Sequence, residues 1–266
     1  VDSYPFKIAP ATDARPFPHH FLRFKSLLGL FGEDRGSVLP FAEWGLIALL
    51  ATLVQSTFLG LLMLAVPVMI AGRQRSERPD RSLLAYFFAI GFAYMTAEIA
   101  AIQQLSLMLG HPIYAVVAVL ATFLVCSGAG SFWSDQVRAD RGWVVSALLV
   151  LLLSLFALAL LAFVRLLQPT HILFRACGAA ILVCPLAILM GIPFPHGIRS
   201  FAGESQTQIA WAWAFNALAS VVAAPLAALI ALERGSPELF LFAAIAYGVA
   251  SLVARPQSSI SPQSLT

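Results

Sequence analysis

The side chains in this sequence that could do chemistry are few, and the most unusual ones lie inside long apolar stretches. Glu98 is the one acidic residue well away from the ends of such a stretch, and Tyr94 precedes it by one helical turn. Gln103 and Gln104 follow, and Asn216 lies within another apolar stretch. Carboxyl, phenol and amide groups in apolar surroundings either hydrogen-bond one helix to another or handle a proton, an ion or a substrate. These five residues form the candidate intramembrane polar site.

Two interpretations of these residues remain open. In one, Glu98 is protonated and hydrogen-bonds to a neighbouring helix, because a carboxylate at the centre of a bilayer costs at least about 2.5 kcal/mol. In the other, Glu98 faces a polar cavity and attracts a proton or a cationic amine. The amide of Asn216 can bond two neighbours at once, which would fix the register of its helix.

Two further motifs contain histidine and proline. His111 and Pro112 fall in a short link between apolar stretches, and we expect a helix turn there. Pro193 and Pro195 stand just before His196, and two prolines so close together predict that the preceding helix stops. The histidines have no metal-site spacing, and the sequence contains no GxSxG, Walker or GxGxxG motif. No catalytic residue, metal or cofactor is therefore predicted, and enzymatic activity is left open.

Composition decides the class of protein that must position these residues. Of the 266 residues, 60% are hydrophobic and 11% are charged, whereas soluble domains carry about 25% charged residues. This excludes a soluble globular enzyme, and the apolar content excludes a disordered chain. The net charge of +3 does not indicate a nucleic-acid partner, because the basic residues lie in short loops, as topology signals do. The three cysteines lie within apolar stretches and are expected to be free thiols.

Seven apolar stretches are long enough to cross a bilayer, which takes about 20 residues. Short links between them predict antiparallel neighbours. We therefore expect an all-α integral membrane protein, a polytopic bundle of about seven transmembrane helices over residues 42–254. The stretches are 46–70, 82–108, 113–133, 143–164, 172–192, 209–232 and 237–254.

The two ends of the chain differ from the bundle. Residues 1–41 contain both signs of charge, and 21–31 are apolar with two cations, which predicts an extramembrane arm with an interfacial amphipathic helix. Residues 255–266 are rich in Ser, Gln and Pro, which predicts a disordered tail. Four arginines in the first loop place that loop and the tail in the cytoplasm. The expected location is a bacterial inner (cytoplasmic) membrane.

Four segments in order carry a resemblance to a known family. They are ATDARPF at 11–17, EIAAIQQ at 98–104 with LGHP at 109–112, GIPFPHG at 191–197, and WAWAFN at 211–216. Together they resemble the C-terminal membrane block of the membrane-bound, fused spermidine-synthase-like (polyamine aminopropyltransferase-like) proteins. The resemblance implies transporter-like helices beside an aminopropyltransferase-like enzyme domain. The glycine-rich loop of that domain is not in these residues, and Ala14 replaces the second acid of the TDDRP motif.

Two functions follow as hypotheses. The first is a non-catalytic membrane subunit or module, an accessory or structural component of a larger membrane assembly, whose partners are the lipid bilayer and other membrane subunits. The alternative is a transporter-like module that moves a cationic amine or a proton through a polar cavity centred on Glu98, linked to a polyamine-synthase-like enzyme domain. The sequence does not specify a small-molecule substrate.

Overall fold

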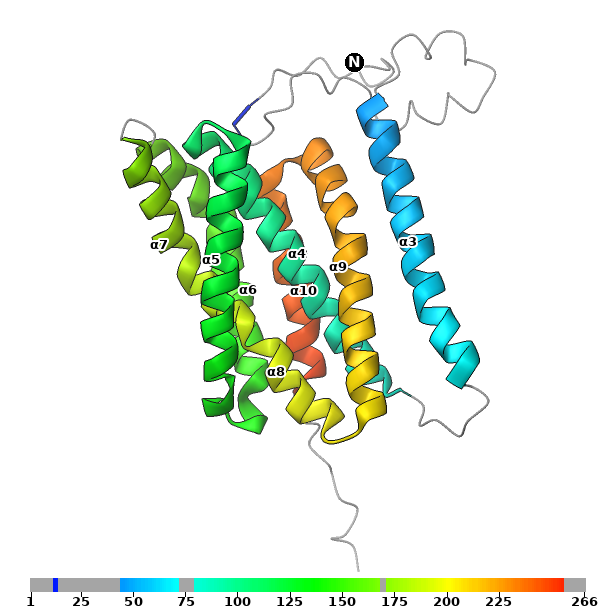
Figure 1. Ribbon diagram of the computed structural model, residues 1–266. Helices are drawn as coiled ribbons and strands as arrows, with labels where there is room; N and C mark the ends of the chain where they lie inside the picture. Colours follow the sequence, from blue (N-terminus) through cyan, green and yellow to red (C-terminus); the bar gives the residue numbers. More distant parts are fainter. Residues whose placement is uncertain (1–11, 14–43, 72–78, 168–170, 256–266) are drawn as a thin grey trace, which may run out of the picture.

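The computed structural model describes residues 12–13, 44–71, 79–167 and 171–255 (Figure 1). The predicted arm, apart from Thr12 and Asp13, and the predicted tail beyond Arg255 lie outside the described residues. Four short helical turns are η3 (Ser134–Gln136), η4 (Ala139–Arg141), α8 (Pro193–Gly197) and η5 (Ile198–Ala202). The long helices are α3 (Trp44–Ala71), α4 (Arg81–Leu109), α5 (Pro112–Trp133), α6 (Gly142–Leu167), α7 (Ile172–Gly191), α9 (Gln206–Arg234) and α10 (Ser236–Val253).

Within the described residues, seven helices are long and apolar enough to cross a membrane. The prediction of an all-α chain with seven such segments is therefore confirmed. The predicted bounds are close to the observed ones; one of the largest differences is at α9, predicted from residue 209 and observed from Gln206. The agreement follows from length and composition. In an apolar medium, a run of this size forms all its backbone hydrogen bonds within a single helix.

The ends of the helices are set by local chemistry. The Asp80 carboxylate accepts a hydrogen bond from the backbone N–H of Ser82 (3.1 Å) and caps the start of α4. Gly110 ends α4 with φ 73°, a left-handed conformation that glycine adopts without strain. Gly235 joins α9 to α10 with φ 104° and ψ 160°, an extended conformation of positive φ that is open to glycine. These turns return each helix along its neighbour, as the short links predict.

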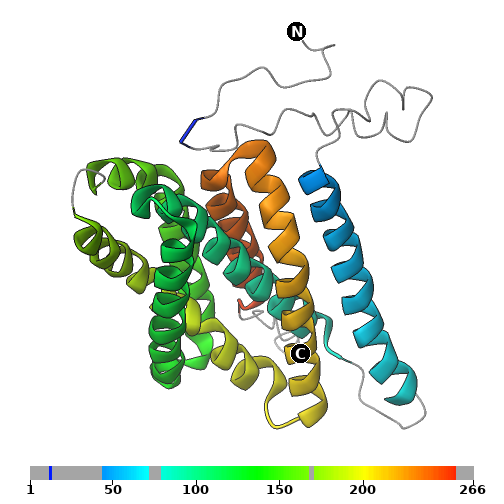
Figure 2. The same cartoon turned by 45° about the horizontal axis from the view of Figure 1, so that its top comes forward.

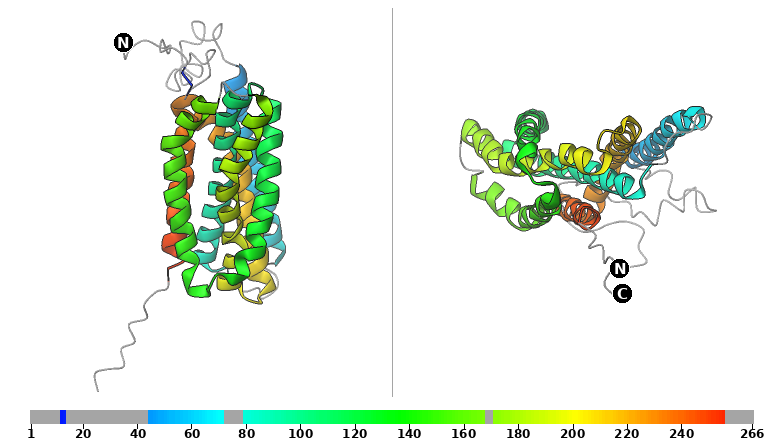
Figure 3. Two further views of the ribbon diagram at one scale, coloured as in Figure 1. Left: turned by 90° about the vertical axis from the view of Figure 1, so that its left-hand side faces the viewer. Right: turned by 90° about the horizontal axis from the view of Figure 1, so that it is seen from below.

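Helix α4 is the centre of the bundle, and α3 is at its edge (Figures 1 and 2). α4 packs against α5, α9 and α10, and 61% of its apolar stretch is buried. α3 packs against α9, and only 6% of its apolar stretch is buried. Seen from below, α3 lies at one end of an elongated cross-section and α5, α6 and α7 gather at the other (Figure 3). Most of the surface of α3 is therefore not covered by the other described helices.

The closest helix packing joins α5 and α7, which run in the same direction. A Cβ atom on Gly130 would collide with the backbone carbonyl of Ile188, and one on Gly191 would collide with that of Ser127. Glycine at both positions lets the two backbones touch. Ser127 and Gly130 belong to a patch of small residues at 127–131, and the structure places part of this patch in the contact.

The helix that precedes Pro193 and Pro195 stops, as expected, and a short helix follows at once. α7 ends at Gly191, but α8 begins two residues later and continues through a π-helical turn to Ala202. Pro193 is the first residue of α8 and Pro195 lies in its first turn. Backbone N–H groups in a first turn have no intrahelical acceptor, so their absence in proline costs nothing there. Proline therefore fits the start of α8, and the helical path resumes after the break at Ile192.

Asp13 links the N-terminal segment to the bundle. Its Oδ2 lies 2.8 Å from Nη2 of Arg165 near the end of α6. Both side chains are more than half exposed, so the ion pair contributes roughly 0–1 kcal/mol. The pair places Asp13 at the end of the bundle where α6 finishes.

Candidate functional site

The predicted polar residues lie on two helices, α4 and α9, which begin at the same end of the bundle. Tyr94, Glu98, Gln103 and Gln104 all belong to α4, and Asn216 belongs to α9. The starts of α4 and α9 are joined by a hydrogen bond from the backbone N–H of Asp80 to Oε1 of Gln208 (3.2 Å). Corresponding turns of the two helices therefore lie at similar depths.

Asn216 holds α9 against α4. Its Nδ2 donates to the carbonyl oxygen of Phe87 (3.2 Å). The Ser220 hydroxyl, one turn further on, lies 3.0 Å from the carbonyl of Asn216 and 3.5 Å from that of Gly91. A Cβ on Gly91 would sit 2.6 Å from both Nδ2 and the backbone oxygen of Asn216. The amide thus reaches the α4 backbone only because position 91 has no side chain.

Tyr94 ties α4 to α5. Its hydroxyl donates to the Ser127 hydroxyl (3.3 Å), and its ring meets that of Phe123 edge-on at 5.6 Å. Tyr94, Ser127 and Asn216 also line one cavity of about 440 Å³, bounded by residues of α4, α5, α7, α8, α9 and α10. This volume lies within the range of about 300–1,000 Å³ that small-molecule sites occupy.

The cavity, which we call the Tyr94 groove, is neutral and partly aromatic. None of its lining residues is charged. Phe194 and Trp213 stack edge-on at 4.6 Å in its wall. Leu124 and Trp213 line the groove and are largely exposed, so the groove reaches the lateral surface of the bundle. Its hydroxyl and amide groups can hydrogen-bond a small molecule, and its lining contains no carboxylate that would pair with a cation.

Glu98 lies outside this groove. The residue is buried, with 7% of its surface exposed, and it stands one turn beyond Tyr94. Among the described residues no hydrogen bond or ion pair reaches its carboxyl group, and it lines neither the Tyr94 groove nor the groove between α3 and α9. The transport hypothesis expected a polar cavity centred on Glu98. The polar groove lies one turn away instead, at Tyr94.

The two glutamines lie toward the other end of α4. Gln104 Nε2 donates to the Ser236 hydroxyl at the start of α10 (2.8 Å). The Oε1 atoms of Gln103 and Gln104 are buried and have no hydrogen-bond donor among the described residues. Of the five predicted residues, the structure therefore brings together only Tyr94 and Asn216.

The turn residues have local roles. His111 precedes α5 and its Nδ1 accepts from the backbone N–H of Ile113 (3.3 Å), while Pro112 is the first residue of the helix. His196 is buried, and its Nε2 lies 3.3 Å from the Ser200 hydroxyl. Within the described residues, no three His, Cys, Asp or Glu side chains are arranged to hold a metal ion.

Other contacts were not predicted from the sequence. The Tyr86 hydroxyl donates to the carbonyl of Pro193 (2.9 Å), and Arg175 Nη1 donates to the carbonyl of Met108 (2.8 Å). Cys126 and Cys184 are free thiols with sulfur atoms 2.7 Å apart. Hydroxyl groups and isolated thiols carry little hydropathy signal, so only their tertiary neighbours reveal them. Of these residues, only Arg175 could have been singled out from the sequence, because it is a charged residue near the end of an apolar stretch.

Charged side chains close the end of the bundle where α5 finishes. Arg199 pairs with Asp135 and also donates from Nη2 to the carbonyl of Ser134 (2.6 Å). Nearby, Arg138 donates from Nε to Asp140 (3.1 Å), and this hydrogen bond lowers the pKa of the Asp140 carboxyl below its ordinary value. The charges thus sit at the end of the bundle, while its interior is tied by neutral groups.

No family model, curated protein or solved structure matches this chain.

Proposed function

We propose that the chain is a non-catalytic integral membrane subunit, an accessory or structural component of a larger membrane assembly. The observation that carries the proposal is how the buried polar side chains are used. Each of the following hydrogen bonds joins two different helices, as expected of polar groups that fix helix packing. The donors are Tyr86, Tyr94, Gln104, Arg175, Asn216 and Ser251.

The outer surface supports the same proposal. Large apolar side chains are exposed on several helices, including Phe58 on α3, Val125 on α5 and Leu158 on α6. A soluble monomer rarely exposes continuous apolar patches of more than a few hundred Å². Lipid and the apolar faces of other membrane subunits are the surroundings that fit these side chains.

The finer location belongs to the proposal as well. We place the chain in a bacterial inner membrane, and the cytoplasmic side of the tail is supported by the basic residues at the end where α5 finishes and α9 begins, namely Arg138, Arg141 and Arg199. Reporter fusions after Arg255 and in the link at residues 168–170 test this orientation. We expect the first to report cytoplasm and the second the opposite side; the reverse result would overturn the orientation.

Glu98→Gln separates this function from the transport alternative. The substitution removes the ionisable carboxyl group but keeps its size and polarity. If the chain is a non-catalytic subunit, the variant keeps the same companions when it is isolated from native membranes, and proton- or amine-linked uptake into vesicles is the same as for wild type. A variant that assembles normally but loses uptake would overturn the proposal.

The transport alternative has one specific observation in its favour. The Tyr94 groove is an uncharged cavity of about 440 Å³ that lies one turn from the buried Glu98 carboxyl. A cationic amine or a proton would pass this groove with Glu98 as its counter-charge, and Gln103, Gln104 and Asn216 would line the path. The resemblance to spermidine-synthase-like proteins supplies the polyamine class of substrate. Loss of uptake in Glu98→Gln is the result this alternative requires.

A further inference from the structure

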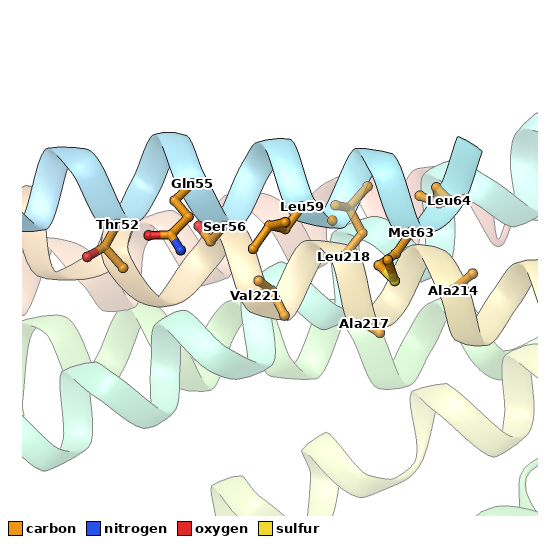
Figure 4. Close-up of a pocket in the computed structure, with 11 residues that line it drawn as sticks. Thr52, Gln55, Ser56, Leu59, Met63, Leu64, Ala214, Ala217, Leu218 and Val221 are labelled. Carbon is orange, nitrogen blue, oxygen red and sulfur yellow. The ribbon is translucent and has the colours of Figure 1, made fainter. Parts of the chain in front are cut away.

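A second groove separates α3 from α9. Seven residues of α3 and four residues of α9 enclose a cavity of about 580 Å³, into which Gln55, Ser56 and Leu59 project (Figure 4). At one end, Leu46 of α3 packs with Leu229 of α9. Further along, the contact is held at Gly60, where a Cβ atom would sit 2.5 Å from Leu218. Because protein interiors leave few voids larger than a water molecule, a groove of this size is filled in the native surroundings.

One polar group in this groove has no partner. The Thr52 hydroxyl donates to the carbonyl of Ala48 (2.8 Å) and the Ser56 hydroxyl to that of Leu53 (3.1 Å), so both are satisfied within α3. The Gln55 amide is exposed and makes no hydrogen bond with any described residue. It lies about 4 Å from the midpoint of α3, taking a rise of about 1.5 Å per residue. An amide at that depth needs a partner, because lipid chains offer none.

The two faces of α3 differ in chemistry. Beside Leu59, Met63 and Leu64, the groove face carries Thr52, Gln55, Ser56 and Gly60, which are small or hydrogen-bonding residues of the kind that line helix–helix contacts in membranes. The opposite face carries Val54 and other large apolar residues that are exposed, which suits lipid. The facing wall on α9 includes Ala214 and Ala217, which are also small. Both walls therefore include small residues that allow close contact with a neighbouring helix.

We propose that the groove between α3 and α9 receives α3 of a second copy of this chain, with Gln55 of the two copies hydrogen-bonded across a twofold axis normal to the membrane. This inference rests on the proposed function as a subunit of a membrane assembly, and it names one partner in that assembly.

Two features select a second copy. A twofold axis along the membrane normal places identical residues at the same depth, so Gln55 meets a matching amide without any further adjustment. A glutamine amide donates through N–H and accepts through its oxygen, so two of them satisfy each other. α3 contains no charged residue, so no repulsion opposes the contact.

Disulfide trapping in native membranes tests the arrangement. The background carries Cys126→Ala, Cys177→Ala and Cys184→Ala. Leu59→Cys lies on the groove face, one turn from Gln55, and Leu61→Cys lies at nearly the same depth on the opposite face. Mild oxidation is expected to convert most of the Leu59→Cys chain to a covalent dimer and to leave Leu61→Cys monomeric. Equal yields at the two positions would overturn the proposal.

Gln55→Leu in the Leu59→Cys chain tests the amide. Loss of an interhelical hydrogen-bonded pair worth about 1–2 kcal/mol weakens association about fivefold to thirtyfold, and the yield of covalent dimer should fall accordingly. An unchanged yield would refute the role of Gln55. Native mass spectrometry that finds one chain with a retained phospholipid would assign the groove to lipid and overturn the dimer.

The outcomes also separate this inference from the function on which it rests. If Leu59→Cys gives no dimer while the chain still co-isolates with other polypeptides in a fixed ratio, the second copy is refuted and the proposed function stands. If the chain is isolated alone and monomeric, both fail.

Discussion

Replacing Gly130 by alanine tests the α5–α7 contact with the smallest available perturbation. The added Cβ atom would collide with the backbone carbonyl of Ile188. A backbone carbonyl cannot rotate away as a side chain can, so the two helices must move apart. Overpacking of this kind costs about 1–3 kcal/mol, and we place this case in the upper half of that range.

The same substitution also has a favourable part. Alanine stabilises a helix interior by about 0.5–1 kcal/mol relative to glycine. The expected net effect of Gly130→Ala is therefore a loss of about 1–2.5 kcal/mol in the free energy of unfolding. Gly128, two residues earlier in the same patch, has no atom within 4 Å of its added Cβ, so Gly128→Ala should gain about 0.5–1 kcal/mol.

Reversible unfolding in mixed micelles, titrated with a denaturing detergent and followed by circular dichroism, measures both variants. The difference between them should be about 2–3 kcal/mol, because the helix-propensity term is common to both. Equal unfolding midpoints for Gly128→Ala and Gly130→Ala would refute the close backbone contact between α5 and α7.

Two further predictions use the same measurement of unfolding, and a third uses carboxyl titration by NMR. Ser236→Ala leaves the buried Nε2 of Gln104 without its acceptor and should lower the free energy of unfolding by about 0.6–1.7 kcal/mol; no change would contradict the α4–α10 tie. Asn216→Ala removes the hydrogen bond from α9 to the α4 backbone and should cost a similar amount, whereas the control Leu158→Ala, at an exposed position on α6, should have no effect. Arg138→Ala should raise the pKa of Asp140 toward its ordinary value, because the folded-state pKa is lowered by that arginine; any stability from the pair is present above the unfolded-state pKa and is lost as pH falls through the folded-state value, which carboxyl titration by NMR can follow.

The seven helices could be predicted from the sequence because bilayer thickness fixes how long an apolar run must be. The sequence does not predict which of the helices is central. α3 and α5 are similarly apolar, yet 6% of one and 22% of the other is buried. Hydropathy reports transfer into an apolar environment and does not distinguish lipid from protein as the neighbour. The position of α3 at the edge of the bundle therefore had to come from the structure.

The candidate site was predicted in part. Tyr94 and Asn216 stand out as polar groups in apolar stretches, and the structure places them on one groove. Ser127, which receives the Tyr94 hydrogen bond, was hidden among the small residues that surround it. Glu98 carried the strongest signal from the sequence but does not line the groove, because its position on α4 is one turn too far along. The proline motif predicts the end of α7, but it does not reveal that α8 begins at Pro193, where proline fits a first helical turn.

Gentle isolation from native membranes tests the central claim most directly. The chain should leave the membrane in a complex of fixed stoichiometry with other membrane polypeptides, measured by native mass spectrometry and identified by peptide sequencing. A chain that is recovered alone, and that drives amine or proton uptake when it is reconstituted by itself, would contradict the account.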